Sequence, residues 1–156
     1  DIAVQDATFP IAFWEAMHQA GYRPDQLGTS LYPTNGDAGD RRAVFLGIAG
    51  ALQRRFGKRL FFAEFSYPSG LMGPPFAWNT TQAGYPQTPD GQFRYLRDLV
   101  IGAIETGAVS GIRPWGPDYC LASAGWAPMS LFREDGIAKP ALGAIEDGLR
   151  AFAAAG

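Results

Sequence analysis

The 156-residue sequence contains very little cysteine and histidine. Its single cysteine, Cys120, excludes an intrachain disulfide. Its single histidine, His18, excludes a histidine-rich metal site and argues against a Ser-His-Asp triad. No Asp-rich loop of the calcium-binding kind is present either. We therefore expect neither a metal nor a cofactor.

The sequence also lacks an excess of charge and a long apolar run. Its 13 basic and 15 acidic residues give a net charge of −2, which predicts no nucleic-acid partner. No run approaches the roughly 20 apolar residues that a membrane span needs. No glycine-rich phosphate motif follows a predicted strand. Aromatic residues are abundant at 13%, as expected for a folded core or a sugar-binding cleft.

Short apolar runs alternate with amphipathic segments along the chain, and we expect one α/β domain over residues 1–156. The predicted strands are Ile2–Gln5, Gln26–Tyr32, Arg59–Phe65 and Ala108–Trp115. The predicted helices begin at the N-cap Thr8, at Ala43, after the N-cap Thr88 and near Pro140. In the last helix, the inward face is expected to carry Leu142, Ile145, Leu149 and Phe152. The alternation predicts a parallel sheet with right-handed crossovers.

One carboxylate interrupts the most apolar run. Glu64 lies in the sequence FFAEF, near the end of the predicted strand Arg59–Phe65. Burying an unpaired carboxylate is costly, so the position indicates either a function or a partner. Active sites of parallel sheets lie at the C-terminal ends of the strands. Glu64 is therefore the candidate catalytic residue, and the alternative is a structural acid paired with an arginine at the rim.

Polar and aromatic residues lie at the corresponding ends of the neighbouring strands. Tyr32 ends the preceding strand, and its hydroxyl could hold the Glu64 carboxylate in orientation. Trp115 ends the following strand and could form the floor of a sugar subsite, while Arg113 and Asp118 could bind sugar hydroxyls. Each also has a structural interpretation: a turn tyrosine, a plug of the barrel mouth or a loop salt bridge.

The segments 66–87 and 116–138 are long for loops in a compact domain, and such loops are usually functional. Their aromatic rings are candidate platforms for sugar rings, and their amides are candidate hydrogen-bonding partners of sugars. These candidates are Tyr67, Trp78, Tyr85, Trp126, Asn79 and Gln82.

The segment PDQLGTSLYP, and the helix that ends in RRFGKRLFFAEFSYP, resemble the later strands of glycoside hydrolase family 53. This family comprises the arabinogalactan endo-β-1,4-galactanases of a retaining barrel clan. The residues that match its motifs are Asp25, Gly28, Ser30, Tyr32, Pro33, Gly57, Lys58 and Glu64. The segment GIAKPAL, near the end of the chain, also resembles the family's segment that leads into the final helix. The resemblance covers most of Arg23–Leu149.

The resemblance implies the C-terminal half of a (β/α)₈ TIM barrel, about strands five or six to eight. It further implies retaining hydrolysis of a polysaccharide β-glycosidic bond with Glu64 as nucleophile, in a secreted or periplasmic protein. Leu31, Phe65 and the stretch Arg113–Trp115 depart from the family pattern at positions that line the cleft. A galactan-like substrate is therefore one possibility among several polysaccharides.

Retaining hydrolysis needs a second carboxyl group, and in this clan the acid/base residue follows an asparagine at the end of strand four. No Asn-Glu pair occurs in the sequence, so we expect the acid/base residue upstream, outside this chain. The sequence does not begin with methionine, and 156 residues fall short of the roughly 250 of a full barrel. Three explanations of the short length remain open: a truncated product, half of a split enzyme, or a half-barrel that self-associates.

An isolated half-barrel would expose two sheet edges, so we expect self-association or pairing with an N-terminal half, and little activity alone. Two other functions remain open. One is a non-catalytic carbohydrate-binding protein or scaffold on a degenerate barrel. The other is a different barrel enzyme, such as an aldolase, which would need a strand-end lysine or a phosphate site; Lys58 and Lys139 are instead predicted at helix termini.

Overall fold

The computed structural model of the chain describes residues 6–36, 39–121, 123 and 125–155. Helices and strands alternate as predicted, and the strand predicted at Ile2–Gln5 lies outside the described residues. The elements are α1 (Thr8–Gln19), β1 (Leu27–Leu31), α2 (Arg41–Phe56), β2 (Leu60–Phe65), α3 (Pro89–Thr106), β3 (Val109–Pro114), the 3₁₀ helix η2 (Pro140–Gly143) and α4 (Ala144–Ala155). Within these ranges, no helix combines the length and apolar character of a bilayer span.

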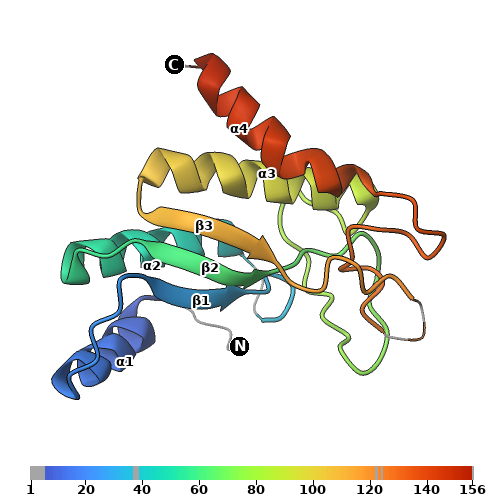
Figure 1. Cartoon of the computed structure of the whole chain (residues 1–156). Helices are drawn as coiled ribbons and strands as arrows, with labels where there is room; N and C mark the ends of the chain where they lie inside the picture. The colour runs from blue at the N-terminus through green and yellow to red at the C-terminus, as the bar shows by residue number, and fades with distance from the viewer. Residues whose placement is uncertain (1–5, 37–38, 122, 124, 156) are drawn as a thin grey trace.

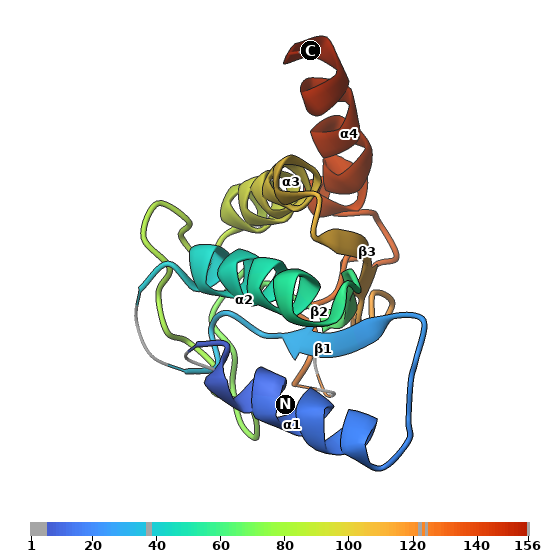
Figure 2. The ribbon, with the colours of Figure 1, turned by 90° about the vertical axis from the view of Figure 1, so that its left-hand side faces the viewer.

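The three described strands form a parallel sheet in the order β1-β2-β3. Figure 1 shows the strands running side by side in the same direction, with the long loops gathered beyond their C-terminal ends. Turned by 90°, the strands form a short arc that α1, α2 and α3 follow on one side (Figure 2). Among the described strands, β1 and β3 each pair with one neighbour only, so the arc has two open edges.

Local capping explains where the helices begin. The Asp40 carboxylate accepts the Ala43 N–H at 3.0 Å and starts α2 two residues before the predicted position. Thr88 caps α3 as predicted, accepting the Gly91 N–H at 3.1 Å. The prediction for Thr8 is wrong. It is the first helical residue of α1, and its N–H donates to the Asp6 carboxylate instead.

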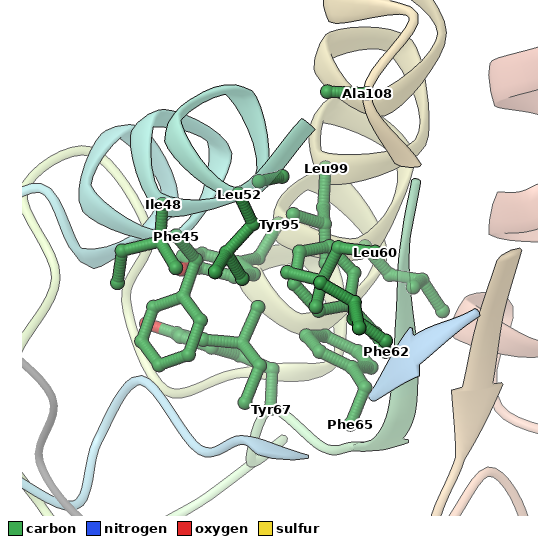
Figure 3. Packing of buried hydrophobic residues seen from close by; sticks show 14 of the residues in the cluster. Phe45, Ile48, Leu52, Leu60, Phe62, Phe65, Tyr67, Tyr95, Leu99 and Ala108 are labelled. Carbon is green, nitrogen blue, oxygen red and sulfur yellow. The ribbon is translucent and has the colours of Figure 1, made fainter. Parts of the chain in front are cut away.

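The main core lies between the helices and the outer face of the sheet (Figure 3). It is built from apolar side chains of α2, α3 and the strands that recur at the expected spacing. These include Leu27, Leu31, Phe45, Ile48, Leu52, Leu60, Phe62, Phe65, Tyr67, Tyr95, Leu96 and Leu99, all 3% exposed or less. Burial of this set supplies the main favourable term in folding.

A β-bulge in β2 changes the facing of its last residues. Phe62 and Phe65 both lie in the core although they are three residues apart, which regular alternation does not allow. The pairing accounts for this, since Thr29 and Ser30 of β1 lie opposite Phe62 and Glu64 of β2. One extra residue in β2 therefore places Glu64 on the face opposite Phe62.

Apolar side chains remain exposed near both open edges of the sheet. The prediction of an inward face for the last helix is wrong in part, because Leu142, Leu149 and Phe152 are at least 40% exposed. Close approach of Gly148 to Val100 packs α4 onto α3, and no described segment covers the rest of its apolar face. At the other edge, Phe9 and Phe13 of α1 are similarly exposed.

Candidate active site

The Glu64 carboxylate is held by two hydroxyl groups of the neighbouring strand. Tyr32 donates from its hydroxyl to Glu64 Oε2 at 2.8 Å, and Ser30 donates from Oγ to the same oxygen at 3.2 Å. Ser30 lies on β1, and Tyr32 is the first residue after the strand. The two residues are two positions apart, so their side chains project from the same face of the strand end. The β2 bulge turns Glu64 toward that face, which brings the three side chains together.

The environment keeps Tyr32 protonated. Burial raises the pKa of its phenol well above the ordinary value of 10.0, and the hydrogen bond to Glu64 and the charge of Glu64 raise it further. A neutral phenol is a hydrogen-bond donor, whereas a phenolate could only accept. Tyr32 therefore acts as a fixed donor toward the carboxylate over the whole neutral range.

An aromatic cavity of about 450 Å³ opens over Glu64 at the C-terminal ends of the strands. Tyr32 and Trp78 have ring centroids 5.3 Å apart, and Trp78 meets Trp126 at 5.8 Å with an angle of 82°. Among the described lining residues, Glu64 is the only carboxylate. The lining consists of Tyr32, Glu64, Phe76, Trp78, Trp115, Tyr119 and Trp126. Flat rings around one carboxylate suit a ligand with apolar faces and a polar reacting centre.

The sequence-based candidates Trp78, Trp115 and Trp126 thus lie around the same cavity as Glu64 and Tyr32. Sequence reasoning missed Phe76 and Tyr119, and it missed the Ser30 hydroxyl as a second donor to Glu64. The position of Ser30 two residues before Tyr32 was a usable signal, because side chains two apart share a face of a strand.

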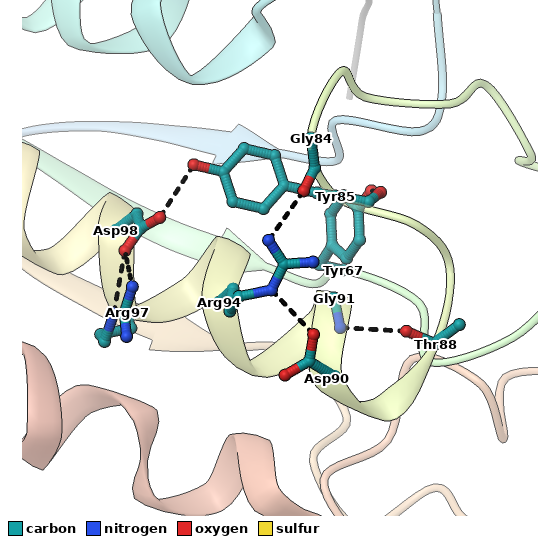
Figure 4. Close-up of polar contacts among 9 residues, drawn as sticks. All are labelled: Tyr67, Gly84, Tyr85, Thr88, Asp90, Gly91, Arg94, Arg97 and Asp98. Carbon is teal, nitrogen blue, oxygen red and sulfur yellow. Dashed lines mark hydrogen bonds and ion pairs between the residues drawn. The ribbon is translucent and has the colours of Figure 1, made fainter.

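Two predicted sugar platforms lie elsewhere. Tyr67 is 1% exposed, stacks on Tyr95 at 4.3 Å and donates its hydroxyl to the backbone oxygen of Tyr85. Tyr85 points toward α3, where its hydroxyl bonds the Asp98 carboxylate at 2.9 Å (Figure 4). Neither ring lines the cavity over Glu64, because the loop folds back on α3 and uses both tyrosines to pack there. That these rings bind sugar stays a prediction.

The two amides brace the loop instead of lining the cavity. Asn79 accepts the Met72 N–H at 2.8 Å and donates to the Met72 oxygen at 2.9 Å. Gln82, 2% exposed, accepts the Arg41 N–H and donates to the Pro33 oxygen, both at 3.0 Å. Both ends of each amide already have backbone partners and neither amide lines the cavity, and their predicted role as hydrogen-bonding partners of a sugar stays a prediction.

Arg113 and Asp118 lie on either side of Trp115 and are both exposed, but neither lines the cavity. Their predicted contacts with sugar hydroxyls remain predictions. No group of three His, Cys, Asp or Glu side chains that could hold a metal ion occurs among the residues placed by the structure.

The chain matches no model of a known protein family. A protein of Niallia circulans, described as an uncharacterized protein in the bgaB 5′ region, is 28% identical over 124 residues, covering 74% of this chain and 33% of that protein. Among solved structures, the Ignisphaera aggregans GH53 catalytic domain is similar with a TM-score of 0.77 and 24% identity, covering 91% of this chain and 44% of that chain.

Two further structures are similar at lower identity. A fungal β-1,4-galactanase has a TM-score of 0.67 at 17% identity, covering 89% of this chain and 43% of that chain. Xylanase 10B of Thermotoga maritima has a TM-score of 0.59 at 18% identity, covering 92% and 42%. The chain thus spans less than half the length of each protein it resembles. Its fold is that of part of an α/β barrel, similar to the C-terminal half of the barrel in the GH53 catalytic domain.

Proposed function

We propose that this chain is the nucleophile-bearing part of a retaining glycoside hydrolase that cleaves a β-glycosidic bond of a polysaccharide. The observation that carries the proposal is the Glu64 carboxylate, oriented by Tyr32 and Ser30 at the base of an aromatic cavity. The similarity in fold to a GH53 catalytic domain and to a xylanase supports this assignment.

The hydrogen bonds suggest how the carboxylate would react. Both described donors bind Oε2, which leaves Oε1 available to attack the anomeric carbon of a bound sugar. Attack forms a glycosyl ester with Glu64 and breaks the glycosidic bond, whose oxygen leaves with a proton from a second carboxylic acid. Water activated by that second group then attacks the same carbon and regenerates Glu64.

The second carboxyl group would come from polypeptide outside this chain. Retaining enzymes place their two carboxyl groups about 5–5.5 Å apart, and Glu64 has no such companion among the described lining residues of the cavity. An N-terminal half-barrel would supply the acid and would also cover the open edges of β1 and β3. Apolar grooves at both edges support this, one lined by Phe9, Phe13 and Trp14, the other by Val109, Ile112 and Leu149.

Galactan is the substrate to test first. The GH53 domain and the galactanase have higher TM-scores than the xylanase, and the Glu64 motif resembles that of family 53. The cavity-lining aromatics are compatible with stacking on the apolar faces of pyranose rings. Xylan, whose sugar lacks the hydroxymethyl group, is the matched comparison.

The test is covalent labelling in an assembled barrel. The chain is combined with a family 53 N-terminal half-barrel and incubated with an activated 2-fluoro-galactoside, which traps the glycosyl ester. Peptide mass spectrometry should find the label on Glu64, and Glu64→Gln should remain unlabelled. Tyr119→Phe, a cavity variant that keeps the carboxylate, should still be labelled.

A non-catalytic carbohydrate-binding protein is the second candidate, favoured by the single carboxylate in the described cavity. It predicts that galacto-oligosaccharides bind and alter tryptophan fluorescence while Glu64 stays unlabelled in every assembled barrel. That outcome would overturn the hydrolase proposal and leave the sugar-binding cleft intact.

A further inference from the structure

We propose that Lys139 is a positioning residue of the aromatic cleft, whose ammonium group occupies a cage of oxygens and so fixes the turn 127–130 beside Trp126. It does not line the cavity, so it would act through the turn. The inference rests on the proposed function only in treating the cavity as a sugar-binding cleft.

The ammonium group lies among oxygens from two different loops. Its Nζ donates to the backbone oxygens of Ala127 and Ser130, both at 2.8 Å, and to Ser69 Oγ at 3.0 Å. The Pro128 oxygen lies farther away, at 3.4 Å. Since Ser69 follows β2 and the others follow β3, one cation connects the two loops that form the cleft.

A second side chain meets the same turn from α3. Gln92, 1% exposed, donates from Nε2 to the Tyr67 oxygen at 2.8 Å and to the Ser130 oxygen at 3.2 Å. The backbone adds a contact of its own, as the Ser69 N–H donates to the Pro128 oxygen at 2.8 Å. The carbonyl groups of this turn are therefore the convergence point of both loops and of α3.

Convergent carbonyl groups require a donor at their centre. Their oxygens carry partial negative charge and repel one another, and buried acceptors without partners are costly. Gln92 supplies a neutral amide, whereas Lys139 supplies a full positive charge with three donor hydrogens. Loss of the ammonium group would take the shorter bond from the Ala127 and Ser130 oxygens, which would keep, among the described donors, only the Ser130 N–H at 3.3 Å and Gln92 Nε2 at 3.2 Å. It would also remove the positive charge that offsets the repulsion among these oxygens, so the turn would have to move.

Movement of the turn would reach the cleft directly. Trp126 immediately precedes it, is 5% exposed, and packs against Phe76 at 5.1 Å and Trp78 at 5.8 Å. Met129, within the turn, belongs to the same apolar cluster and is 1% exposed. The position of the aromatic wall therefore depends on the geometry of the oxygens around Lys139.

The near-UV circular dichroism of the full chain without sugar tests this. Three of the four tryptophans line the cavity, so their signal reports its packing. Burial lowers the pKa of Lys139 to about 8, with Cys120 acting in the opposite direction. Measurement near pH 6 therefore keeps the ammonium charged. Lys139→Ala should lose tryptophan signal, whereas Lys58→Met, which removes the only other lysine, should keep it.

Chemical rescue separates cation binding from general loss of structure. Ammonium chloride should restore the signal of Lys139→Ala, because a free ammonium ion can enter the vacated cage. Tetramethylammonium chloride at equal ionic strength should not, since it is too large and has no N–H donor. Lys139→Met should lose signal without rescue, because its side chain fills the space.

An unchanged signal in Lys139→Ala would overturn the proposal. So would a loss of signal that ammonium fails to reverse, including the case where the variant does not fold either with or without ammonium. Because no sugar is present in any sample, these outcomes are independent of whether Glu64 is a nucleophile.

Discussion

The coupling between Tyr32 and Glu64 can be measured without any substrate. Tyr32→Phe removes only the hydroxyl, so the ring keeps its packing against Trp78 and Trp126. The lost hydrogen bond is 2.8 Å long and has a charged acceptor, a class worth about 1.5–3 kcal/mol. Both residues are half-buried, so we expect a coupling near the lower end, about 1.5 kcal/mol.

A double-mutant cycle with Glu64→Ala isolates this energy. Urea unfolding followed by far-UV circular dichroism gives the free energy of unfolding for the chain, both single variants and the double variant. Tyr32→Phe should destabilise the chain in the presence of Glu64 and have little effect in its absence. Ser30→Ala is the matched comparison, and its coupling should be smaller because its bond to Glu64 is 3.2 Å long.

A coupling below about 0.3 kcal/mol for Tyr32 would refute the reasoning, because that is the usual error of additivity between independent sites. It would mean that the hydroxyl and the carboxylate do not meet in solution. A larger coupling for Ser30 than for Tyr32 would also contradict the geometry, since it would reverse the order of the two distances.

Three further predictions follow from the structure. Burial raises the pKa of Tyr67 to about 12 and raises the pKa values of Tyr32 and Tyr95 well above the ordinary 10.0. The unfolded chain therefore loses its tyrosine protons first, so the free energy of unfolding should fall as pH rises above 10. A flat profile in urea titrations up to pH 11 would contradict this. Deletion of Ala63 should remove the β2 bulge but keep Glu64 on the cavity side, because Glu64 would then directly follow the core-facing Phe62 in a regularly alternating strand. An assembled barrel with this deletion should therefore still take up the 2-fluoro-galactosyl label on Glu64, and loss of the label would contradict the facing inferred from the pairing of β2 with β1. Light scattering should show self-association of the isolated chain, and Leu149→Lys at the exposed face of α4 should reduce it. A chain that stays monomeric at all concentrations would contradict the expectation that the two open sheet edges drive association.

Capping and periodicity predicted most of the elements because both depend on neighbours in the chain. Thr88 caps α3 through the amide three residues later, and Phe45, Ile48 and Leu52 recur at helical spacing. Thr8 misled the prediction because Asp6, two residues earlier, accepts the Thr8 N–H, and α1 begins with Thr8 itself as a helical residue. The face of α4 was misjudged because an apolar stripe says which side avoids water but not whether anything covers it.

Within the site, the sequence determined that a carboxylate ends one strand and a tyrosine the strand before it. Only the tertiary structure decided that the two meet. Strict alternation would put Glu64 on the same face as Phe62, and the extra residue that reverses this appears only when β2 is paired with β1.

The loop aromatics show the same division. The sequence concentrated tyrosines and tryptophans in two long loops but could not tell those that face the cavity from those that face the core. The folded structure sent Trp78 and Trp126 to the cavity and Tyr67 to the stack on Tyr95. The physical reason is that a loop has no period: each ring is placed by contacts with residues far away in the chain, and those contacts exist only once the strands and helices have assembled.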